Sequence, residues 1–398
     1  MNRTLPLLVA VFFVTLLASR LVPVRPVQSG EENNGLPGAR ATIYAAQYPS
    51  LQDALDAVPP AGGLVQLPAG IFEIEQPLVI RTEDTCIEGA GTATHIKNIN
   101  TNGQPAILVS RTNEKYPKRN KETELWRIRL ANFRVTGNET SGHGIDARGV
   151  NEILIDGVTI SENGGDGILL WHCYEDPRVC DSLITYNQGV GLNLQGCHDI
   201  VVSSNQFEEN QDALHCFNGY NLCMTGNCLD DHLGHGIVIE NTYGSVVSGN
   251  MIEECTGTAI ILDRDCYGNT LSANIIAHNG SGIDLRDAHG CSVSANTFTI
   301  IATDALRIGP DSGRIAVSGN SFCNSYIGGG KLRRGTYDIA AAGMVLDGTR
   351  DIGVTGNVFS GTQPQAIAIS GPPSDDVVLV GTLLTNGGRE PAQPPESR

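Results

Sequence analysis

The chain has 398 residues, enough for two or three average domains, so its length leaves the architecture open. It contains 47 glycines, and only 5% of its residues are aromatic and 17% charged, which excludes a disordered chain and a helical bundle. The formal net charge of −17 argues against a nucleic-acid-binding protein, because phosphate contacts need clustered lysine and arginine.

Residues 1–29 are expected to be an export segment. Arg3 precedes a charge-free stretch from Thr4 to Ser19, whose apolar run is short for a bilayer span but suits the core of a signal peptide. A cleaved signal peptide and an uncleaved membrane anchor both fit this pattern. We therefore expect a secreted, periplasmic or cell-surface protein, with a linker at residues 30–41 and a disordered tail at residues 386–398.

A repeat dominates the chain from residue 106 to residue 369. The phrase small–aliphatic–any–aliphatic occurs eleven times, beginning at Ala106, Gly144, Gly167, Gly191, Ala213, Gly236, Ala259, Gly282, Ala305, Gly343 and Ala366. Most steps are about 23 residues, and two longer steps contain insertions of about 15 residues. A period this short leaves no room for a helix in each repeat, so it predicts one solenoid coil per repeat.

The predicted fold is all-β: a single-stranded right-handed parallel β-helix over residues 42–385, with coils of about 23 residues. A short amphipathic capping helix is expected where Leu51, Leu55 and Val58 share one face after a Ser50-x-x-Asp53 start. The aliphatic residues of the repeated phrase should form one inward column, namely Ile168, Leu192, Leu214, Ile237, Ile260 and Ile283.

This organisation resembles the right-handed parallel β-helix of the pectate-lyase-like superfamily across residues 42–385. The resemblance implies that the N-terminal helix plugs the open end of the solenoid. It implies no single activity, because this fold carries lyases, hydrolases, epimerases and binding proteins.

The candidate catalytic residues come from outward positions. Residues one period apart lie on neighbouring coils about 4.8 Å apart, so outward positions form columns along the solenoid. One face is rich in acids, histidines and arginines, and we expect the catalytic residues to be among Asp166, Asp212, His215, His235, Asp263, Asp284 and Arg286. His215 or His235 would serve as a base oriented by Asp212, and arginines would neutralise a substrate carboxylate.

Substrate-binding residues are expected on the same face and in the insertions. The candidates are Trp171, Asn193, Phe217, Arg264, Arg307, Lys331, Arg333 and Arg334. Trp171 and Phe217 share one column two coils apart, where they would either stack on sugars or pack under a loop. The basic insertions around residues 113–125 and 326–337 are expected to project from one side and wall a groove for an anionic chain.

Paired acids recur in the turns of three successive coils. Glu208, Asp230, Asp231 and Glu253 are the candidate ligands of a calcium ion, the one cofactor that the sequence suggests. Solvated turn acids are the alternative, and the pattern favours them over a calcium site. Nearby asparagines at residues 163, 187, 210 and 279 are expected to form a structural ladder.

Two local stretches resemble enzyme motifs. Asp230-Asp231 and Gly234-His235-Gly236 are similar to the DD and GHG motifs of polygalacturonases, although here they fall within seven residues. The stretch Gly144–Arg148 is similar to the G-F-D-P-H motif of mannuronan C5-epimerases, with Arg148 in place of the histidine.

The sequence does not decide which of the eleven cysteines form disulfides and which are free thiols. Cys173 could pair with Cys197 on the next coil or with Cys180 across a short loop, whereas Cys216 is expected to be a buried free thiol.

The sequence favours a carbohydrate-active protein that acts on a polysaccharide, as a lyase or C5-epimerase of an acidic uronate polymer. The alternatives are a polygalacturonase-like hydrolase, a non-catalytic carbohydrate-binding or surface protein, and an accessory factor similar to a maturation protein for a copper enzyme. We expect a monomer with a polysaccharide partner, no nucleic acid, and membrane contact only through an N-terminal anchor.

Overall fold

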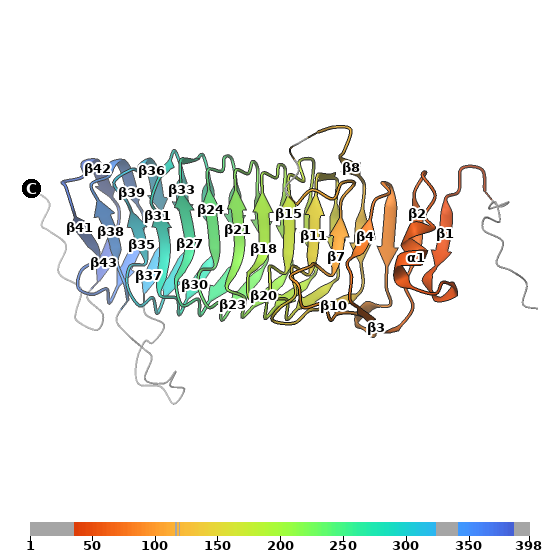
Figure 1. Cartoon of the computed structure of the whole chain (residues 1–398). Coiled ribbons are helices and arrows are strands. Elements are labelled where there is room, and N and C mark those ends of the chain that lie inside the picture. The colour runs from red at the N-terminus through yellow and green to blue at the C-terminus, as the bar shows by residue number, and fades with distance from the viewer. Residues whose placement is uncertain (1–35, 116–117, 119, 324–340, 386–398) are drawn as a thin grey trace, which may run out of the picture. The chain divides into compact units, whose positions relative to one another are not determined.

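The computed structural model describes residues 36–115, 118, 120–323 and 341–385. The chain divides into two units, Met1–Ala39 and Arg40–Arg398. In the first unit, residues 36–39 form a turn in which the Ala39 N–H donates to the Leu36 carbonyl (3.0 Å). The second unit holds the β-helix (Figure 1). The export segment and tail predicted for residues 1–29 and 386–398 lie outside the described residues.

The β-helix consists of three long parallel sheets that the chain visits in turn (Figure 1). In the described residues they hold 16, 13 and 12 strands, and we name them sheets A, B and C.

The strands of sheet A are β1 (Ala41–Tyr44), β2 (Gly63–Gln66), β5 (Thr85–Glu88), β9 (Arg129–Ala131), β13 (Leu154–Asp156), β16 (Arg178–Cys180), β19 (Val201–Ser203), β22 (Cys223–Thr225), β25 (Val246–Ser248), β28 (Cys266–Tyr267), β29 (Thr270–Ser272), β32 (Ala288–His289), β33 (Ser292–Ser294), β36 (Gly313–Ser318), β39 (Arg350–Thr355) and β42 (Asp375–Val380). The strands of sheet B are β3 (Gly70–Ile74), β6 (Thr94–Asn98), β10 (Arg134–Thr136), β14 (Thr159–Ser161), β17 (Leu183–Thr185), β20 (Gln206–Glu208), β23 (Cys228–Asp230), β26 (Met251–Glu253), β30 (Ile275–Ala277), β34 (Thr297–Thr299), β37 (Ser321–Cys323), β40 (Val358–Ser360) and β43 (Leu383–Thr385).

The strands of sheet C, which carries the candidate site, are β4 (Leu78–Ile80), β7 (Ile107–Val109), β11 (Ile145–Arg148), β15 (Ile168–Trp171), β18 (Val190–Gln195), β21 (Asp212–Phe217), β24 (Ile237–Glu240), β27 (Thr258–Asp263), β31 (Ser281–Leu285), β35 (Leu306–Ile308), β38 (Met344–Asp347) and β41 (Ile367–Ser370). A separate pair joins β8 (Leu125–Trp126) to β12 (Val150–Asn151). The described part of the chain has one α-helix, α1 (Leu51–Asp56), and two 3-10 turns, η1 (Ala45–Gln47) and η2 (Gly91–Ala93).

The predicted inward column of sheet C is confirmed. Its six members are Cα partners across five consecutive strand pairs, and all are fully buried: Ile168, Leu192, Leu214, Ile237, Ile260 and Ile283. Because side chains alternate along a strand, the residues between them point outward and present the candidate site.

Asparagine ladders hold the turns together. The longer ladder consists of Asn205, Asn227, Asn250, Asn274, Asn296, Asn320 and Asn357. After Asn205, each asparagine oxygen accepts from the backbone and side-chain N–H groups of the asparagine one coil earlier; for Asn227 and Asn205 both distances are 3.0 Å. The second ladder includes buried Asn163, Asn187 and Asn210, joined in the same way. These bonds satisfy backbone donors that the turns would otherwise leave buried and unpaired.

Helix α1 caps the first strand of sheet C. Ser50 accepts from the Asp53 N–H (3.1 Å), the N-cap that the sequence predicts. Gln52 accepts from the Val79 N–H (2.8 Å) and donates to the Val79 carbonyl (3.1 Å), so the helix covers the edge of β4. Edge coverage of this kind prevents pairing with another chain. In the described residues no helix is long and apolar enough to cross a bilayer.

The strands that flank the two insertions do not support the prediction that both project from one side, although residues 326–337 of the second insertion lie outside the described residues. The first lies between β7 of sheet C and β8, whereas the strands that flank the second, β37 and β38, belong to sheets B and C. The two insertions therefore leave the coil at different corners. The repeat spacing gives the length of an insertion but not the turn that contains it.

The cysteines do not form the disulfides that the sequence left open, since all eleven are free. Cys173 and Cys197 are buried, and their thiols face the carbonyls of Ala147 (3.6 Å) and Leu170 (3.4 Å). Cys216 is the buried free thiol that we expect, and burial raises its pKa to about 12.

Candidate functional site

The candidate site lies on the outward face of sheet C, where the period predicts columns of polar residues. Strand pairing confirms the register: Asn193 pairs with His215 and Gln195 with Phe217 across β18 and β21, and Phe217 pairs with Glu240 on β24. Trp171 pairs with Gln195, so Trp171 and Phe217 do share a column two coils apart.

Asp212 and His215 form a hydrogen-bonded pair on β21. The Asp212 Oδ2 to His215 Nε2 distance is 2.8 Å, although a spacing of three along a regular strand would put the two side chains on opposite faces. The strand pairing is interrupted at Ala213, between the two residues. The Asp212 side chain is largely buried, whereas the His215 side chain is 33% exposed. When His215 donates through Nε2, its Nδ1 carries the lone pair that can accept a proton.

The surroundings of Asp212 keep it ionised. Burial alone would raise the pKa of Asp212, but the hydrogen bonds from His215 and from the backbone N–H of His235 outweigh it and hold the pKa below its usual value. A carboxylate that stays charged orients the imidazole and stabilises its protonated form.

A depression lies beside this pair. Its volume is about 220 Å³, and its lining includes Gln195, His215, Phe217, Glu240 and Arg264. Arg264 forms an ion pair with Glu240 (3.1 Å) and lies over the Phe217 ring, 5.7 Å from the centroid. The site therefore combines a base, a cation and an aromatic face.

Glu240 is the charged residue of this depression that the sequence did not single out, alongside Gln195 and Val238. It occupies the column between Phe217 and Asp263, so the period places it on the right face. Glu240 matters because the Arg264 side chain extends from the next coil and forms an ion pair with it.

Two other candidate arginines are engaged in separate ion pairs. Arg286 contacts Asp284 (2.8 Å) and Asp263 (3.7 Å), which gathers three of the predicted catalytic residues into one cluster. Arg307 contacts Asp304 (3.5 Å) and Asp347. These residues lie outside the lining of the depression.

Asp166 and His235 fasten one coil to the next. Asp166 accepts from the Val190 N–H (2.9 Å) and from the Asn193 side chain (2.9 Å). His235 accepts from the Thr258 N–H through Nδ1 (2.9 Å), which removes this nitrogen as a base. Both residues therefore have a structural role, because their side chains hold neighbouring coils together at the turn.

The first insertion covers an internal ion pair. Arg148 binds Asp146 through two guanidinium nitrogens and donates to the Glu114 carbonyl (2.7 Å), and both paired side chains are buried. The stretch that resembles the epimerase motif is therefore enclosed. Lys331, Arg333 and Arg334 lie outside the described residues.

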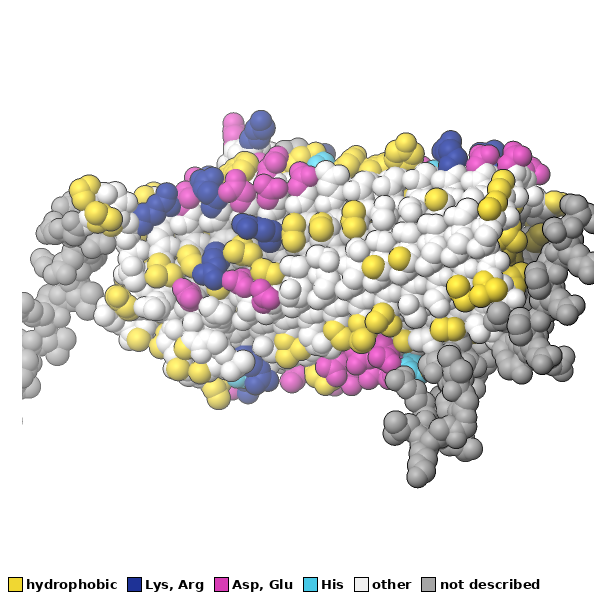
Figure 2. All heavy atoms as spheres, turned by 180° about the vertical axis from the view of Figure 1, so that it is seen from behind, with side chains coloured by type: hydrophobic (Ala, Val, Ile, Leu, Met, Phe, Trp, Pro, Cys, Tyr) yellow, Lys and Arg dark blue, Asp and Glu magenta, His cyan; other side chains and the backbone are white. Residues whose placement is uncertain are grey.

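The four predicted calcium ligands lie near one another where strands β20, β23 and β26 of sheet B end. Acidic side chains gather along the lower edge of the view in Figure 2. Ligand atoms of Asp230, Asp231 and Glu254 lie within 4.8 Å of one another, as do those of Glu253, Glu254 and His278. Glu208 pairs with Asp230 in the sheet. Glu254 belongs to the third acid pair of the sequence pattern but was not among the four predicted ligands, and His278 was missed.

Mutual repulsion is evident in this cluster. Burial and the neighbouring Asp231 and Glu253 carboxylates raise the pKa of Asp230. A hydrogen bond with Asp231 is the main reason that the pKa of Glu254 is raised. A bound cation would relieve this repulsion.

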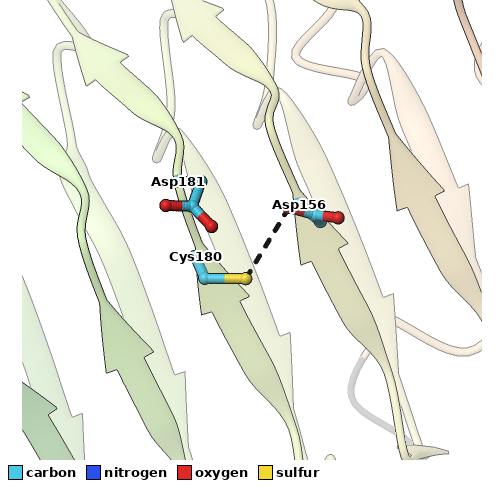
Figure 3. A group of neighbouring side chains, drawn as sticks. All are labelled: Asp156, Cys180 and Asp181. Carbon is cyan, nitrogen blue, oxygen red and sulfur yellow. Dashed lines mark hydrogen bonds between the residues drawn. The ribbon is translucent and has the colours of Figure 1, made fainter.

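A third group of possible ligands lies on sheet A. Figure 3 shows Asp156 and Cys180 on neighbouring strands, with Asp181 beside them and the thiol 3.8 Å from the Asp156 carboxylate. Arg129 already neutralises Asp156 at 2.8 Å. The Arg129 guanidinium therefore already provides positive charge beside the carboxylates of this ligand group.

Two sequence families match parts of the chain. The family described as right handed beta helix region matches residues 86–266, and the family described as periplasmic copper-binding protein (NosD) matches residues 180–370. No curated protein is similar enough to the chain to count as a match.

Solved structures show the same architecture. The A-module of the mannuronan C-5 epimerase AlgE6 from Azotobacter vinelandii has a TM-score of 0.65 at 16% identity and covers 86% of this chain and 99% of its own. Tailspike protein 3 of bacteriophage CBA120 has a TM-score of 0.55 at 11% identity, over 89% of this chain and 62% of its own. A variant of the periplasmic alginate epimerase AlgG has a TM-score of 0.52 at 15% identity, over 87% of this chain and 84% of its own.

At these identities the similarity establishes the fold. The protein is a right-handed parallel β-helix, as the repeat predicts. Its activity has to be argued from the site itself.

Proposed function

We propose that the protein is an extracytoplasmic enzyme that removes the C5 proton of a uronate residue in an acidic polysaccharide, as a lyase or a C5-epimerase. The observation that carries this proposal is the Asp212–His215 pair, which opens onto a depression that also holds Arg264. A base and a cation on one surface are the two groups that this reaction needs first.

In the proposed first step, Nδ1 of His215 takes the C5 proton while Asp212 holds the ring through Nε2. Arg264 binds the substrate carboxylate in place of Glu240, which lowers the energy of the negative charge that develops at C5. The Phe217 ring offers an apolar surface against one face of the sugar.

The second step decides the product. A lyase breaks the C4–O bond, so the electron pair from C5 forms a C4–C5 double bond and the leaving oxygen takes a proton. An epimerase returns a proton to C5 from the opposite face. Both outcomes share the His215 step, so one site supports either.

The hydrolase alternative fits the geometry less well. Asp166 and Asp212 lie two coils apart, about 10 Å, beyond the separation of about 6.5–9.5 Å of inverting enzymes. A hydrolytic general acid needs a raised pKa, whereas the pKa of Asp212 is lowered. Both carboxylates also accept backbone N–H groups of the next coil.

The comparisons support the proposal by analogy. Two similar structures are described as alginate or mannuronan epimerases, and one of them as periplasmic. The export segment expected at residues 1–29 agrees with an extracytoplasmic location. A polysaccharide partner also agrees with the length of the outward face of sheet C.

A panel of polymannuronate, polyguluronate and polygalacturonate tests this function. Ultraviolet absorbance reports the unsaturated uronate of a lyase, and NMR of an unshortened polymer reports epimerisation. We expect one of these signals from the wild type and none from His215→Ala. New reducing ends without absorbance would contradict the proposal and favour hydrolysis.

A second candidate function is a copper-related accessory role, which the family match over residues 180–370 favours. Copper(I) prefers thiolate and thioether ligands. Among the described residues, the one ligand group that contains a cysteine is Asp156, Cys180 and Asp181, and it is mainly carboxylate. Competition with a copper(I) chelator separates the two roles, because the accessory role requires binding that Cys180→Ser abolishes.

A further inference from the structure

A line of aromatic side chains occupies the corner between sheets C and A, one in each of five consecutive coils. We call it the aromatic ridge, and its members are Tyr174, His198, Tyr220, Tyr243 and Tyr267. His198, Tyr220, Tyr243 and Tyr267 are joined by successive parallel bridges, so the line follows the axis of the solenoid. Five coils at about 4.8 Å give a ridge about 20 Å long.

The ridge does not belong to the core. Tyr220 is 41% exposed and Tyr267 is 54% exposed. By contrast, Phe298, Phe322 and Phe359 form a stacked row inside sheet B and are fully buried. Aromatic rings held at the surface contribute little to folding, and lines of them mark interaction surfaces.

The rings separate along the ridge. The centroid distance is 3.6 Å between Tyr174 and His198, and it reaches 6.5 Å between Tyr243 and Tyr267, whose planes are inclined by 57°. At the Tyr267 end, therefore, the rings are not stacked face to face, and apolar ring surface is available to a ligand.

Amide and carboxylate groups flank the rings. The Asn221 side chain donates to Asp199 (2.8 Å), the Asn241 side chain donates to Asn218 (2.6 Å), and the Tyr243 hydroxyl donates to Asn241 (3.0 Å). Planar polar groups beside aromatic faces can hydrogen-bond to neighbouring hydroxyls of a sugar while its C–H face contacts the ring.

The negative charge at this corner favours an uncharged polysaccharide over an acidic one. Asp199 and Asp265 are exposed beside the rings, and burial together with the Asp265 carboxylate raises the pKa of Tyr243. An acidic polymer would meet like charge here. An uncharged chain would not.

We propose that the aromatic ridge binds a neutral polysaccharide, with the chain lying along the solenoid axis over Tyr220, Tyr243 and Tyr267. This surface is separate from the depression around His215, and the proposal does not rest on the reaction proposed there. It gives the protein a second glycan contact, suited to anchoring it to an uncharged polymer.

Affinity electrophoresis of the full chain tests the ridge, with galactomannan or hydroxyethylcellulose in the gel as neutral probes and polygalacturonate as the acidic probe. We expect a neutral probe to retard the wild type. The triple variant Tyr220→Ala, Tyr243→Ala and Tyr267→Ala should lose about tenfold or more in affinity. Tyr186→Ala is the matched control, because Tyr186 is 48% exposed but lies outside the ridge.

A second measurement needs no substitution. Tyrosine iodination of the wild type, followed by peptide mass spectrometry, should show that the retarding probe protects Tyr220, Tyr243 and Tyr267 but not Tyr186. Absence of retardation by both neutral probes, unchanged retardation of the triple variant, or equal labelling with and without probe would each overturn the proposal.

Discussion

His232 occupies a position of the second asparagine ladder, next to Asn210 on the preceding coil. Its side chain is fully buried, Nδ1 faces the Asn210 carbonyl (3.3 Å), and Nε2 has no hydrogen-bond partner among the described residues. Burial lowers its pKa to about 4 from an ordinary value of 6.5. A protonated imidazole is therefore excluded from the native state above this pH.

We predict that His232→Asn makes stability less sensitive to acid. A folded-state pKa below the unfolded value means that the unfolded chain binds the proton first, so stability falls as the pH drops from 6.5 towards 4. The loss attributable to His232 is about 3 kcal/mol at pH 4. Denaturant unfolding at pH 7 and pH 4.5 measures it, with His289→Asn as a surface control. Parallel pH curves for wild type and His232→Asn would refute this account.

The pair of Asp212 and His215 leads to a second prediction at this scale. In Asp212→Asn, the amide oxygen can accept from the His235 N–H, which turns the NH₂ group towards His215 and forces its Nε2 to accept. The proton then resides on Nδ1, and the proposed base is lost. We expect kcat to fall on the order of 10³–10⁴-fold while KM changes little.

Stability provides the control for this variant. The pKa of Asp212 is lowered in the fold, so its contribution to stability is present at neutral pH and lost as the pH falls through the folded-state value. Asp212→Asn should therefore be less stable than the wild type by about 1–3 kcal/mol at pH 7 and should approach it in acid. A fully active Asp212→Asn enzyme would show that His215 is not oriented in this way.

At the scale of elements, the turns after sheet B hold acids that repel one another. Because the pKa of Asp230 is raised in the fold, its ionised form destabilises the protein at neutral pH, and this cost fades as the pH falls towards its ordinary value of 3.8. We predict that Asp230→Asn raises Tm at pH 7 by roughly 1–3 °C and by less at pH 4.5.

The same cluster allows a test of the expected calcium site. Calcium that binds only the folded state stabilises it, so it should raise the Tm of the wild type more than that of Asp230→Asn. Magnesium serves as the control cation, because it demands stricter geometry. Equal shifts in both proteins would leave Asp230 with no part in metal binding.

Much of the architecture follows from the sequence because each coil repeats the last. The step from Gly167 to Gly191 and onward fixes which side chains share a column, so the column of Asn193 and His215 is within reach of the sequence. The period does not say how a long side chain bends. For that reason Arg264, which crosses to Glu240, and His278, which turns to Glu253, needed coordinates.

The aromatic ridge and the insertions differ in how far the repeat period predicts them. The ridge residues recur at the period, as in Tyr220, Tyr243 and Tyr267, and a search for aromatic columns at the turns would have found them. The corner at which an insertion leaves the coil depends on where strands end, which repeat spacing alone does not reveal.

The whole molecule carries two distinct surfaces on one solenoid. The depression on sheet C carries a base, a cation and an aromatic face, and the corner beside it carries the aromatic ridge. Variants of the ridge should leave turnover of short uronate oligomers unchanged, because these substrates can occupy the depression alone. Initial rates with hexamers, compared between wild type and the triple tyrosine variant, test this separation; a loss as large as that of His215→Ala would mean that one continuous site exists.

The most direct measurement is proton NMR of the uronate polymer incubated with the protein in D₂O. We expect the C5 proton signal to disappear, through deuterium at C5 in an epimerised product or through a C4–C5 double bond in a cleaved one. His215→Ala should preserve the signal, whereas His289→Ala, which removes another Asp–His pair at 3.2 Å, should behave as the wild type. A polymer that is shortened while every C5 proton keeps its place and configuration would contradict the central claim.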